Sequence, residues 1–456
     1  MHKQSLLSVL FLTFFLVSAF SQSASNNDFL EIDQTLSQEY DLNQPGIAVL
    51  VAQGNEVIFE KSYGLANLED QTPLSTDMVF EIGSMTKQFT STAILQLVEQ
   101  GKIELDAPIQ QYIDAYPEKR YPITVHHLLS QTSGIPEFFD VDENEFDLLN
   151  QKHTPEELIN YYKNEPLLFE PGTAFKYSNS NYPLLGLIIE KVAQMPLAEY
   201  FEQFIFEPLE MTNTSLWYQE EDQPAAPTGY RFNSENELVM SPPIDGSTVY
   251  AAGGIVSTLR DLFKWYQALR TPNYISKNIV RQLQREKKTS RRKGTGYGYG
   301  FFLEELQGQP VIQHGGNMYG FTSTAMYLPK QDVYVCVLSN RALDNTKNIA
   351  RYIASQVIER PMEYYRQLHP SQAVAYTGKY QLTEPQERVL EILIYEGNLV
   401  MYFPDAPGTE VALLNTGTDA FTAPNINFRV EFNRNPSGEV ESFTVFQDGE
   451  YTWTKI

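Results

Sequence analysis

The hydrophobic pattern of the chain changes near residue 365, and this change constrains the fold more than any other feature. Before it, apolar residues recur with helical spacing in several long segments. After it, only short β-rich runs remain, separated by turn sequences such as Gly397-Asn398 and Pro407-Gly408. The 456 residues also exceed what one hydrophobic core usually organises. We therefore predict a larger domain over residues 22–365 and a small all-β barrel or sandwich over residues 366–456.

The order of the predicted elements in the larger part is typical of an α+β fold. A β-hairpin is predicted over residues 46–60, with its turn at Gly54-Asn55. The strongest helical spacing covers residues 84–100. Later helices are predicted from residue 154 and over 182–206, followed by strands over 321–328 and 332–339 and a closing helix over 346–358. Strands on both sides of a run of helices do not follow a regular βαβ alternation.

Composition excludes several classes of function. The chain has 57 acidic and 33 basic residues, a formal charge of −24, and such a surface repels phosphate backbones, so no nucleic-acid partner is expected. The histidines form no metal-binding motif, and the adjacent pair His126-His127 would diverge on a helix, so we expect neither a metal nor a cofactor. The single cysteine, Cys336, excludes an intrachain disulfide and is expected to be a buried strand thiol.

The first 21 residues have the pattern of a cleavable signal peptide. Lys3 provides a positive start, and the apolar stretch from Leu6 to Phe20 is too short to span a bilayer. Small residues at Ala19 and Ser21 predict cleavage before Gln22, although a retained membrane anchor is the alternative. We therefore expect a secreted or periplasmic protein without stable membrane insertion once the signal is removed.

Two Ser-x-x-Lys sequences occur, and chance alone produces about one or two in a chain of this length. Ser84 and Lys87 open the strongest helix, where this spacing places them on one face. Ser290 and Lys293 lie in a basic loop with no apolar helix after it. A helix start offers N–H groups to a developing oxyanion, and burial would lower the pKa of Lys87 so that it could deprotonate Ser84. By itself, however, the pattern favours an N-cap serine followed by a surface lysine.

Two further sequences change this interpretation. Tyr177-Ser178-Asn179 follows a turn at residues 170–173, which presents the tyrosine from a loop. His314-Gly315-Gly316 precedes a predicted strand, where small residues let a substrate backbone approach a sheet edge. Each alone is compatible with a packed tyrosine or a turn histidine. Together, in this order after Ser84, they indicate a catalytic site.

In this order the motifs resemble those of the serine β-lactamase and penicillin-binding-protein superfamily, particularly its class C-like branch of DD-peptidases, D-amino-acid peptidases and esterases. The motifs Ser-x-x-Lys, Tyr-x-Asn and Lys/His-x-Gly are matched by Ser84/Lys87, Tyr177/Asn179 and His314/Gly316. The resemblance covers about residues 30–360. It implies a β-lactamase/transpeptidase-like fold, with an antiparallel sheet flanked by helices and a helical lobe. The C-terminal region is similar to β-barrel domains appended to some of these proteins.

The resemblance also implies a mechanism through an acyl-enzyme. Ser84 attacks an ester or amide carbonyl, and Lys87 takes or relays its proton. Tyr177 shuttles a proton to the leaving group, and Asn179 helps to position the substrate. Water then releases the acyl group from the serine.

The third motif implies both an oxyanion hole and a departure from the family pattern. The backbone N–H groups of Ser84 and Asn317 would form the oxyanion hole, beside Gly316. Position 314 is His where many β-lactamases have Lys, and Gly315 replaces a hydroxyl residue. A substrate carboxylate would therefore be held more weakly, and in a pH-dependent way near the usual histidine pKa of about 6.5. These departures weigh against efficient antibiotic hydrolysis and leave esterase or peptidase activity open.

Two functions are compatible with these residues. The first is an exported serine hydrolase that acts on a small-molecule or peptide substrate, such as an ester, a D-amino-acid peptide or a β-lactam. The second is a catalytically weak penicillin-binding or sensor protein that keeps the fold. Fast deacylation would distinguish the first from the second. The sequence leaves the physiological substrate and the oligomeric state open.

Overall fold

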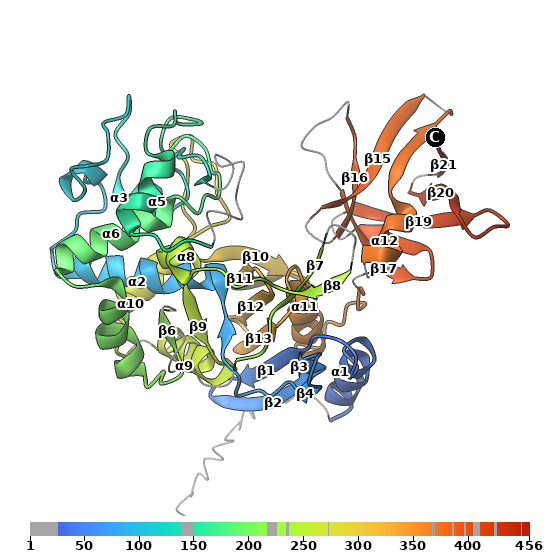
Figure 1. The fold of residues 1–456 in the computed structure, drawn as a ribbon, viewed down its shortest axis with the longest axis horizontal. Helices are drawn as coiled ribbons and strands as arrows, with labels where there is room; N and C mark the ends of the chain where they lie inside the picture. Colours follow the sequence, from blue (N-terminus) through green and yellow to red (C-terminus); the bar gives the residue numbers. More distant parts are fainter. Residues whose placement is uncertain are drawn as a thin grey trace, which may run out of the picture.

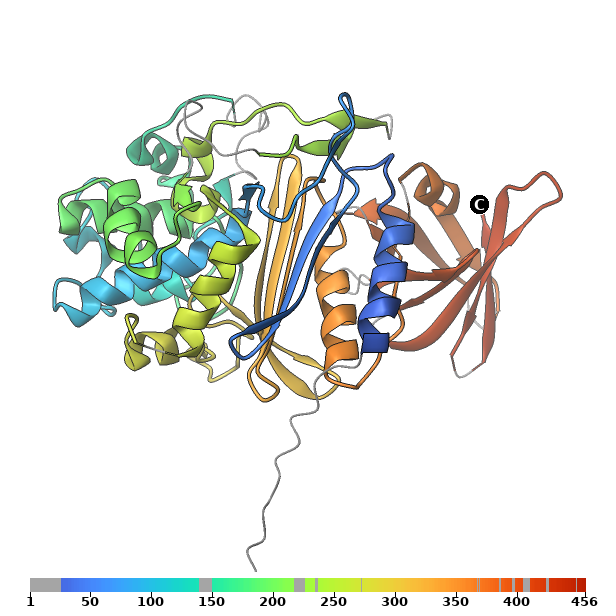
Figure 2. The ribbon, with the colours of Figure 1, turned by 90° about the horizontal axis from the view of Figure 1, so that it is seen from below.

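The computed structural model arranges the chain in layers (Figures 1 and 2). It describes residues 26–138, 150–216, 226–233, 237–271, 273–366, 368, 370–384, 387–395, 398–404, 411–423, 426–447 and 449–456. A helical lobe lies on one face of a central sheet, two helices cover the other face, and a β-barrel lies beyond those helices (Figure 2).

The central sheet has six antiparallel strands in the order β10-β11-β12-β13-β1-β2. They are β1 (Ile47–Gln53), β2 (Glu56–Tyr63), β10 (Phe302–Leu306), β11 (Gln309–Met318), β12 (Phe321–Leu328) and β13 (Val333–Ser339). The N-terminal hairpin joins the later strands through β1, with Ile47 opposite Ser339 and Gln53 opposite Val333. The two ends of the larger part of the chain therefore build one sheet.

The sheet is buried on both faces, which explains the continuous apolar runs of its inner strands. Alternate residues of β1 face opposite sides because side chains alternate along a strand. Ala48, Leu50 and Ala52 belong to the core shared with the helical lobe, whereas Ile47, Val49 and Val51 belong to the core shared with the two covering helices. The covering helices are α1 (Asn26–Glu39) and α11 (Thr346–Val357).

The helical lobe is built around one buried helix, α2 (Thr86–Glu99), which follows a 3-10 turn over Gly83–Met85. The other helices of the lobe are α3 (Val125–Leu129), α5 (Pro155–Tyr162), α6 (Asn181–Ala193), α7 (Leu197–Phe201), α8 (Gly246–Gly253), α9 (Leu259–Arg270) and α10 (Lys277–Leu283). Short strands connect these layers: β3 (Leu65–Asn67), β4 (Thr72–Pro73), β5 (Phe80–Glu81), β6 (Ser215–Leu216), β7 (Tyr230–Phe232), β8 (Leu238–Met240) and β9 (Ile255–Ser257). Most of the surface of α2 is buried, including the side chain of Lys87.

The C-terminal region is a closed antiparallel barrel of eight strands, preceded by the short helix α12 (Pro370–Ala373). The strands are β14 (Gly378–Leu382), β15 (Arg388–Tyr395), β16 (Asn398–Tyr402), β17 (Val411–Gly417), β18 (Ala420–Ala423), β19 (Ile426–Arg434), β20 (Val440–Phe446) and β21 (Glu450–Lys455). Its interior is filled by a separate core that includes Tyr380, Phe432, Phe443 and Trp453. The all-β prediction is confirmed, with a barrel in place of a sandwich.

Most sequence-based predictions of individual elements are confirmed. The hairpin turn falls at residues 54–55, and Thr154 and Glu157 form the capping box that starts α5. The helix predicted from residue 84 begins instead with the 3-10 turn, so Ser84 precedes α2. Cys336 is fully buried in β13, and burial raises the pKa of its thiol to about 12.

The predicted signal peptide lies outside the described residues. No helix in the described part of the chain is long and apolar enough to cross a membrane. The predicted division between residues 365 and 366 falls in the segment between α11 and α12.

Candidate active site

Ser84 and Lys87 lie at the junction of the helical lobe and the central sheet. The 3-10 turn and the first turn of α2 place the Lys87 Nζ 3.0 Å from the Ser84 Oγ. Ser84 is partly exposed to a cavity, whereas Lys87 is fully buried. The arrangement expected from the Ser-x-x-Lys spacing is therefore present.

The Lys87 Nζ has two other hydrogen-bond partners, and both can only accept. It donates to the Asn179 Oδ1 at 2.8 Å and to the Ala252 carbonyl oxygen at 2.7 Å. A neutral amine has two hydrogens, which these acceptors use, so its lone pair is left to face the Ser84 hydroxyl. The geometry therefore suits a lysine that accepts a proton from Ser84.

Burial favours this neutral form. Desolvation lowers the pKa of Lys87 to about 7, and the carboxylate of Glu137 opposes this shift. The rings of Tyr177 and Tyr182 also lie near the amine, each with its centroid 5.1 Å from Nζ. A substantial fraction of Lys87 is consequently unprotonated near neutral pH.

The loop that carries Tyr177 and Asn179 is fixed from two other segments. The Asn179 backbone N–H donates to the Glu137 Oε2 at 2.6 Å, and the Ser178 backbone N–H donates to the Gln131 Oε1 at 3.0 Å. From α5, the Tyr162 hydroxyl donates to the Ser180 carbonyl at 2.7 Å. The Asn179 amide is thus held where it meets Lys87.

The Tyr177 hydroxyl oxygen is buried, and no group in the described residues forms a hydrogen bond of normal geometry with it. Burial raises the pKa of Tyr177 well above its usual value, and the nearby Ser84 hydroxyl opposes this shift only in part. Tyr177 is therefore a neutral phenol near Ser84. In this state it can donate a proton but cannot act as a phenolate base.

His314 is also buried and neutral, which corrects the expectation of a pH-dependent carboxylate anchor. Its Nδ1 donates to the Gly315 carbonyl at 2.6 Å, and its ring lies among those of Tyr177, Tyr297 and Phe302. Burial, with a contribution from the positive charge of Lys87, lowers the pKa of His314 to about 3. The ring is therefore uncharged across the physiological range. It lines the cavity, and its Nε2 lies 3.4 Å from the Tyr297 hydroxyl.

The 3-10 turn that carries Ser84 and strand β11 approach each other at backbone distance. A Cβ atom on Gly316 would lie 2.1 Å from the Ile82 carbonyl oxygen and 2.8 Å from the Ser84 nitrogen. Gly83 has a φ of +52°, and a Cβ there would lie 3.2 Å from the Asn317 nitrogen. Because only glycine permits this approach, the backbone of Asn317 lies against the turn that carries Ser84, and both residues line the cavity.

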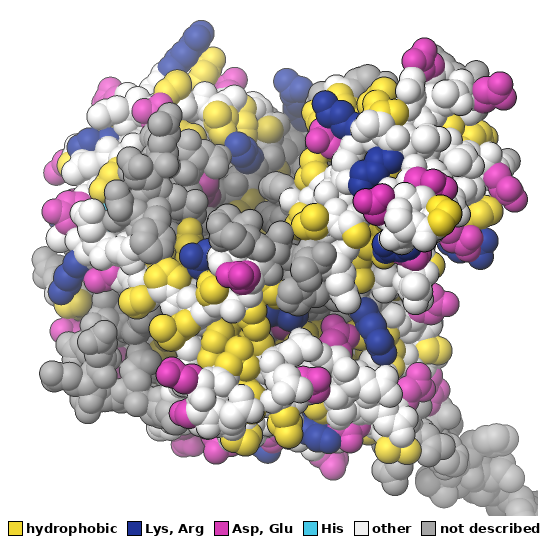
Figure 3. All heavy atoms as spheres, turned by 45° about the vertical axis from the view of Figure 1, so that its right-hand side comes forward, with side chains coloured by type: hydrophobic (Ala, Val, Ile, Leu, Met, Phe, Trp, Pro, Cys, Tyr) yellow, Lys and Arg dark blue, Asp and Glu magenta, His cyan; other side chains and the backbone are white. Residues whose placement is uncertain are grey.

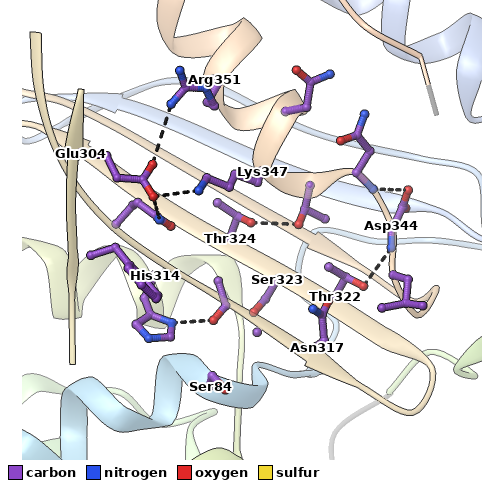
Figure 4. Close-up of a pocket in the computed structure, with 18 of the residues that line it drawn as sticks. Ser84, Glu304, His314, Asn317, Thr322, Ser323, Thr324, Asp344, Lys347 and Arg351 are labelled. Carbon is purple, nitrogen blue, oxygen red and sulfur yellow. Dashed lines mark hydrogen bonds and ion pairs between the residues drawn. The ribbon is translucent and has the colours of Figure 1, made fainter. Parts of the chain in front are cut away.

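The cavity has a volume of about 1270 Å³ and extends from Ser84 across β11 to the N-terminal end of α11 (Figure 4). The pairing of β10 with β11 ends at Gln313, so the next residues of β11 have no partner strand on that side among the described residues. On the far wall, Glu304 forms ion pairs with Lys347 and Arg351 (Figure 4).

The second Ser-x-x-Lys sequence lies away from this centre. Ser290 and Lys293 are exposed in a turn. Within the described residues, no group of three or more His, Cys, Asp or Glu side chains is placed to hold a metal ion.

Sequence reasoning missed some residues that shape the site. Ala252, which accepts a hydrogen bond from Lys87, and Gln131, which accepts one from the Ser178 backbone, were assigned no role from the sequence. Glu137 had no sequence signal, because its position beside Asn179 depends on the meeting of two loops.

Comparison with known proteins gives the family. The beta-lactamase family model matches residues 32–358. This chain belongs to the beta-lactamase family. Protein flp of Staphylococcus aureus (strain MRSA252) is 26% identical over 343 residues, which cover 73% of this chain and 67% of that protein. Penicillin-binding protein 4* of Bacillus subtilis (strain 168) is 25% identical over 444 residues, which cover 91% of this chain and 95% of that protein.

Solved structures of other proteins show the same fold. An octameric penicillin-binding protein homologue from Pyrococcus abyssi has a TM-score of 0.68 and 24% identity, and the match covers 94% of this chain and 99% of that one. The D-amino acid amidase from Ochrobactrum anthropi SV3, in complex with D-phenylalanine, has a TM-score of 0.61 and 22% identity over 74% of this chain and 98% of that one. The match to the Pyrococcus abyssi structure, which covers 94% of this beta-lactamase-family protein, extends into its C-terminal barrel.

Proposed function

We propose that this protein is a serine hydrolase that cleaves an ester or peptide-like amide bond through an acyl-enzyme on Ser84. The observation that carries the proposal is the Lys87 amine, whose two acceptor partners leave its lone pair for the Ser84 hydroxyl. The amidase and penicillin-binding neighbours support this class of reaction.

The proposed reaction begins with a proton transfer. As the Ser84 Oγ bonds to the substrate carbonyl carbon, its proton passes to Lys87. The carbonyl oxygen becomes an oxyanion, which the N–H groups of Ser84 and Asn317 stabilise. Tyr177, neutral because it is buried, donates its proton to the departing oxygen or nitrogen, and Lys87 then returns a proton to Tyr177.

Deacylation reverses these roles with water in place of the leaving group. Water attacks the acyl carbon and one of its protons passes to the neutral Lys87 amine. The Ser84 Oγ then leaves and takes a proton back from Lys87. Asn179 stays bonded to Lys87 and positions both the amine and the substrate. His314 carries no charge in this scheme and supports the ring of Tyr177.

A turnover assay tests the proposal. Wild type should hydrolyse p-nitrophenyl esters or D-amino-acid amides, and Ser84→Ala should abolish this turnover. Ser290→Ala, which changes the serine of the exposed Ser-x-x-Lys sequence, is the matched control and should behave as wild type. An acyl-enzyme that forms but does not turn over would instead support the penicillin-binding or sensor function.

We also propose that the protein is exported, because residues 1–21 have the pattern of a signal peptide. Expression in a bacterial host followed by N-terminal sequencing tests this. The mature protein should begin at Gln22 and be recovered outside the cytoplasm. A chain that keeps Met1 in the cytoplasm would contradict it.

A further inference from the structure

One strand of the C-terminal barrel lines the same cavity as Ser84. Ala412 and Leu414 of β17 belong to its wall, together with residues of β11, β12 and α11. In Figure 3 the surface is notched between the barrel and the rest of the molecule. The barrel therefore contributes side chains to the cleft that contains the nucleophile.

The alternation along β17 explains how the barrel presents these residues. Leu413 points inward and is buried in the barrel core. Ala412 and Leu414 must then point outward, because neighbouring side chains of a strand face opposite sides. Leu414 is only partly exposed although it is on the outside of the barrel, because this side faces the cleft.

The connecting segment between the two parts is held against α11. The side-chain amides of Asn345 and Asn348 both donate to the Tyr365 carbonyl, at 3.0 and 2.7 Å. The Met362 backbone N–H donates to the Ser355 Oγ at 3.1 Å. Arg366, which follows Tyr365, forms a β-bridge with Asn415 of β17. These contacts fix β17 over the N-terminal end of α11, where the cavity opens.

The lining between Ser84 and β17 has a charged part and an apolar part. The wall away from Ser84 holds the ion pairs of Glu304 with Lys347 and Arg351 (Figure 4), and Met362 and Leu414 add apolar side chains to the lining. Its volume of about 1270 Å³ exceeds the 300–1,000 Å³ of typical small-ligand sites. A small ester would fill only a fraction of this space.

We propose that the cleft binds an extended peptide-like chain and that Ala412 and Leu414 of the barrel select for its length. This inference rests on the proposed hydrolase function. A peptide backbone and its polar side chains can hydrogen-bond to the charged section of the wall, while an apolar residue further along contacts Leu414. A purely aliphatic acyl chain would desolvate the charged groups without replacing their hydrogen bonds, which is costly.

Chain-length dependence tests the proposal. The substrates are p-nitrophenyl acetate and N-acetyl oligoalanyl thioesters of one to five residues, prepared in both configurations. In wild type, kcat/KM should rise by about tenfold or more with length in at least one configuration, since the added residues contribute binding energy. Leu414→Trp, which narrows the distal end, should remove this rise while hydrolysis of p-nitrophenyl acetate stays within about twofold of wild type.

Two further variants keep the test decisive. Ala412→Trp places a similar obstruction two residues away on the same face of β17. It should also remove the dependence on length, and it replaces Leu414→Trp if that variant does not fold. Val389→Trp is the matched control, because Val389 is exposed on β15 and does not line the cavity. A rate independent of length in wild type, or equal losses on short and long substrates in the cleft variants, would overturn the proposal. Absence of any adduct with a fluorophosphonate would instead contradict the hydrolase function itself.

Discussion

The two Ser-x-x-Lys sequences of this chain share a spacing but differ in surroundings. Lys87 is fully buried, and desolvation lowers its pKa to about 7, whereas Lys293 is exposed to water in a turn. Ser84 lines a cavity, whereas Ser290 lies on the surface. The motif can support proton transfer from serine to lysine only where burial removes the water that would otherwise stabilise the protonated lysine.

The largest difference between the two lysines is expected on removal of the amine. Lys87→Ala should lower the rate of Ser84 acylation by about a thousandfold, because loss of a general base costs roughly 10² to 10⁴ in rate. Lys293→Ala should leave it unchanged. Stopped-flow measurement with a chromogenic ester checks both, and similar rates in all three proteins would show that burial of Lys87 has no catalytic consequence.

Tyr177 should show the next largest effect. Tyr177→Phe keeps the ring contacts with His314 and Phe302 but removes the proton donor, so kcat/KM for an amide should fall by about a hundredfold. The loss should be smaller for a p-nitrophenyl ester, whose leaving group needs no proton. Tyr161→Phe, on the exposed side of α5, is the control. An equal loss on amide and ester would contradict the role as proton donor.

The pH dependence of acylation tests the role of the neutral Lys87 amine without any substitution. In the proposed mechanism the neutral form of Lys87 is the reactive one, so acylation should rise through pH 7 and level off above it. Below pH 7 the rate should fall roughly tenfold per pH unit. His314 should add no inflection between pH 5 and 8, because burial lowers its pKa to about 3. A rate that is constant from pH 5 to 9 would contradict a titrating lysine.

Glu137 should have the smallest effect. Its carboxylate opposes the lowering of the Lys87 pKa, so Glu137→Gln should move the midpoint of the pH profile to lower pH. The hydrogen bond from the Asn179 backbone is weakened but kept, and acylation at pH 8 should therefore change only severalfold. Glu165→Gln, which changes a half-buried carboxylate after α5 near Lys119, should not move the midpoint. A shift to higher pH would reverse the assigned sign.

Local features of this site could be predicted from the sequence, and features made by distant segments could not. Ser84 and Lys87 are three residues apart at a helix start, so their contact follows from helix geometry. The bond from Lys87 to Ala252, in contrast, joins residues 165 positions apart. The position of Glu137 beside Asn179 likewise depends on two segments that are distant in the sequence, and no sequence periodicity predicts it.

The fold shows the same limit. The class and the buried strands followed from apolar patterns, as the two faces of β1 illustrate. The pKa of His314 was mispredicted because the sequence does not reveal that aromatic rings from β10 and two loops surround it. The position of β17 in the active-site wall likewise depends on how α11 holds the connecting segment.

The most direct test of the central claim is the location of the covalent adduct. Wild type, Ser84→Ala and Ser290→Ala should each be treated with a fluorophosphonate, digested and mapped by tandem mass spectrometry. The adduct should be found on the peptide containing Ser84 in wild type and Ser290→Ala, and on no residue in Ser84→Ala. An adduct on another serine, or one that survives in Ser84→Ala, would contradict the assignment of Ser84 as the nucleophile.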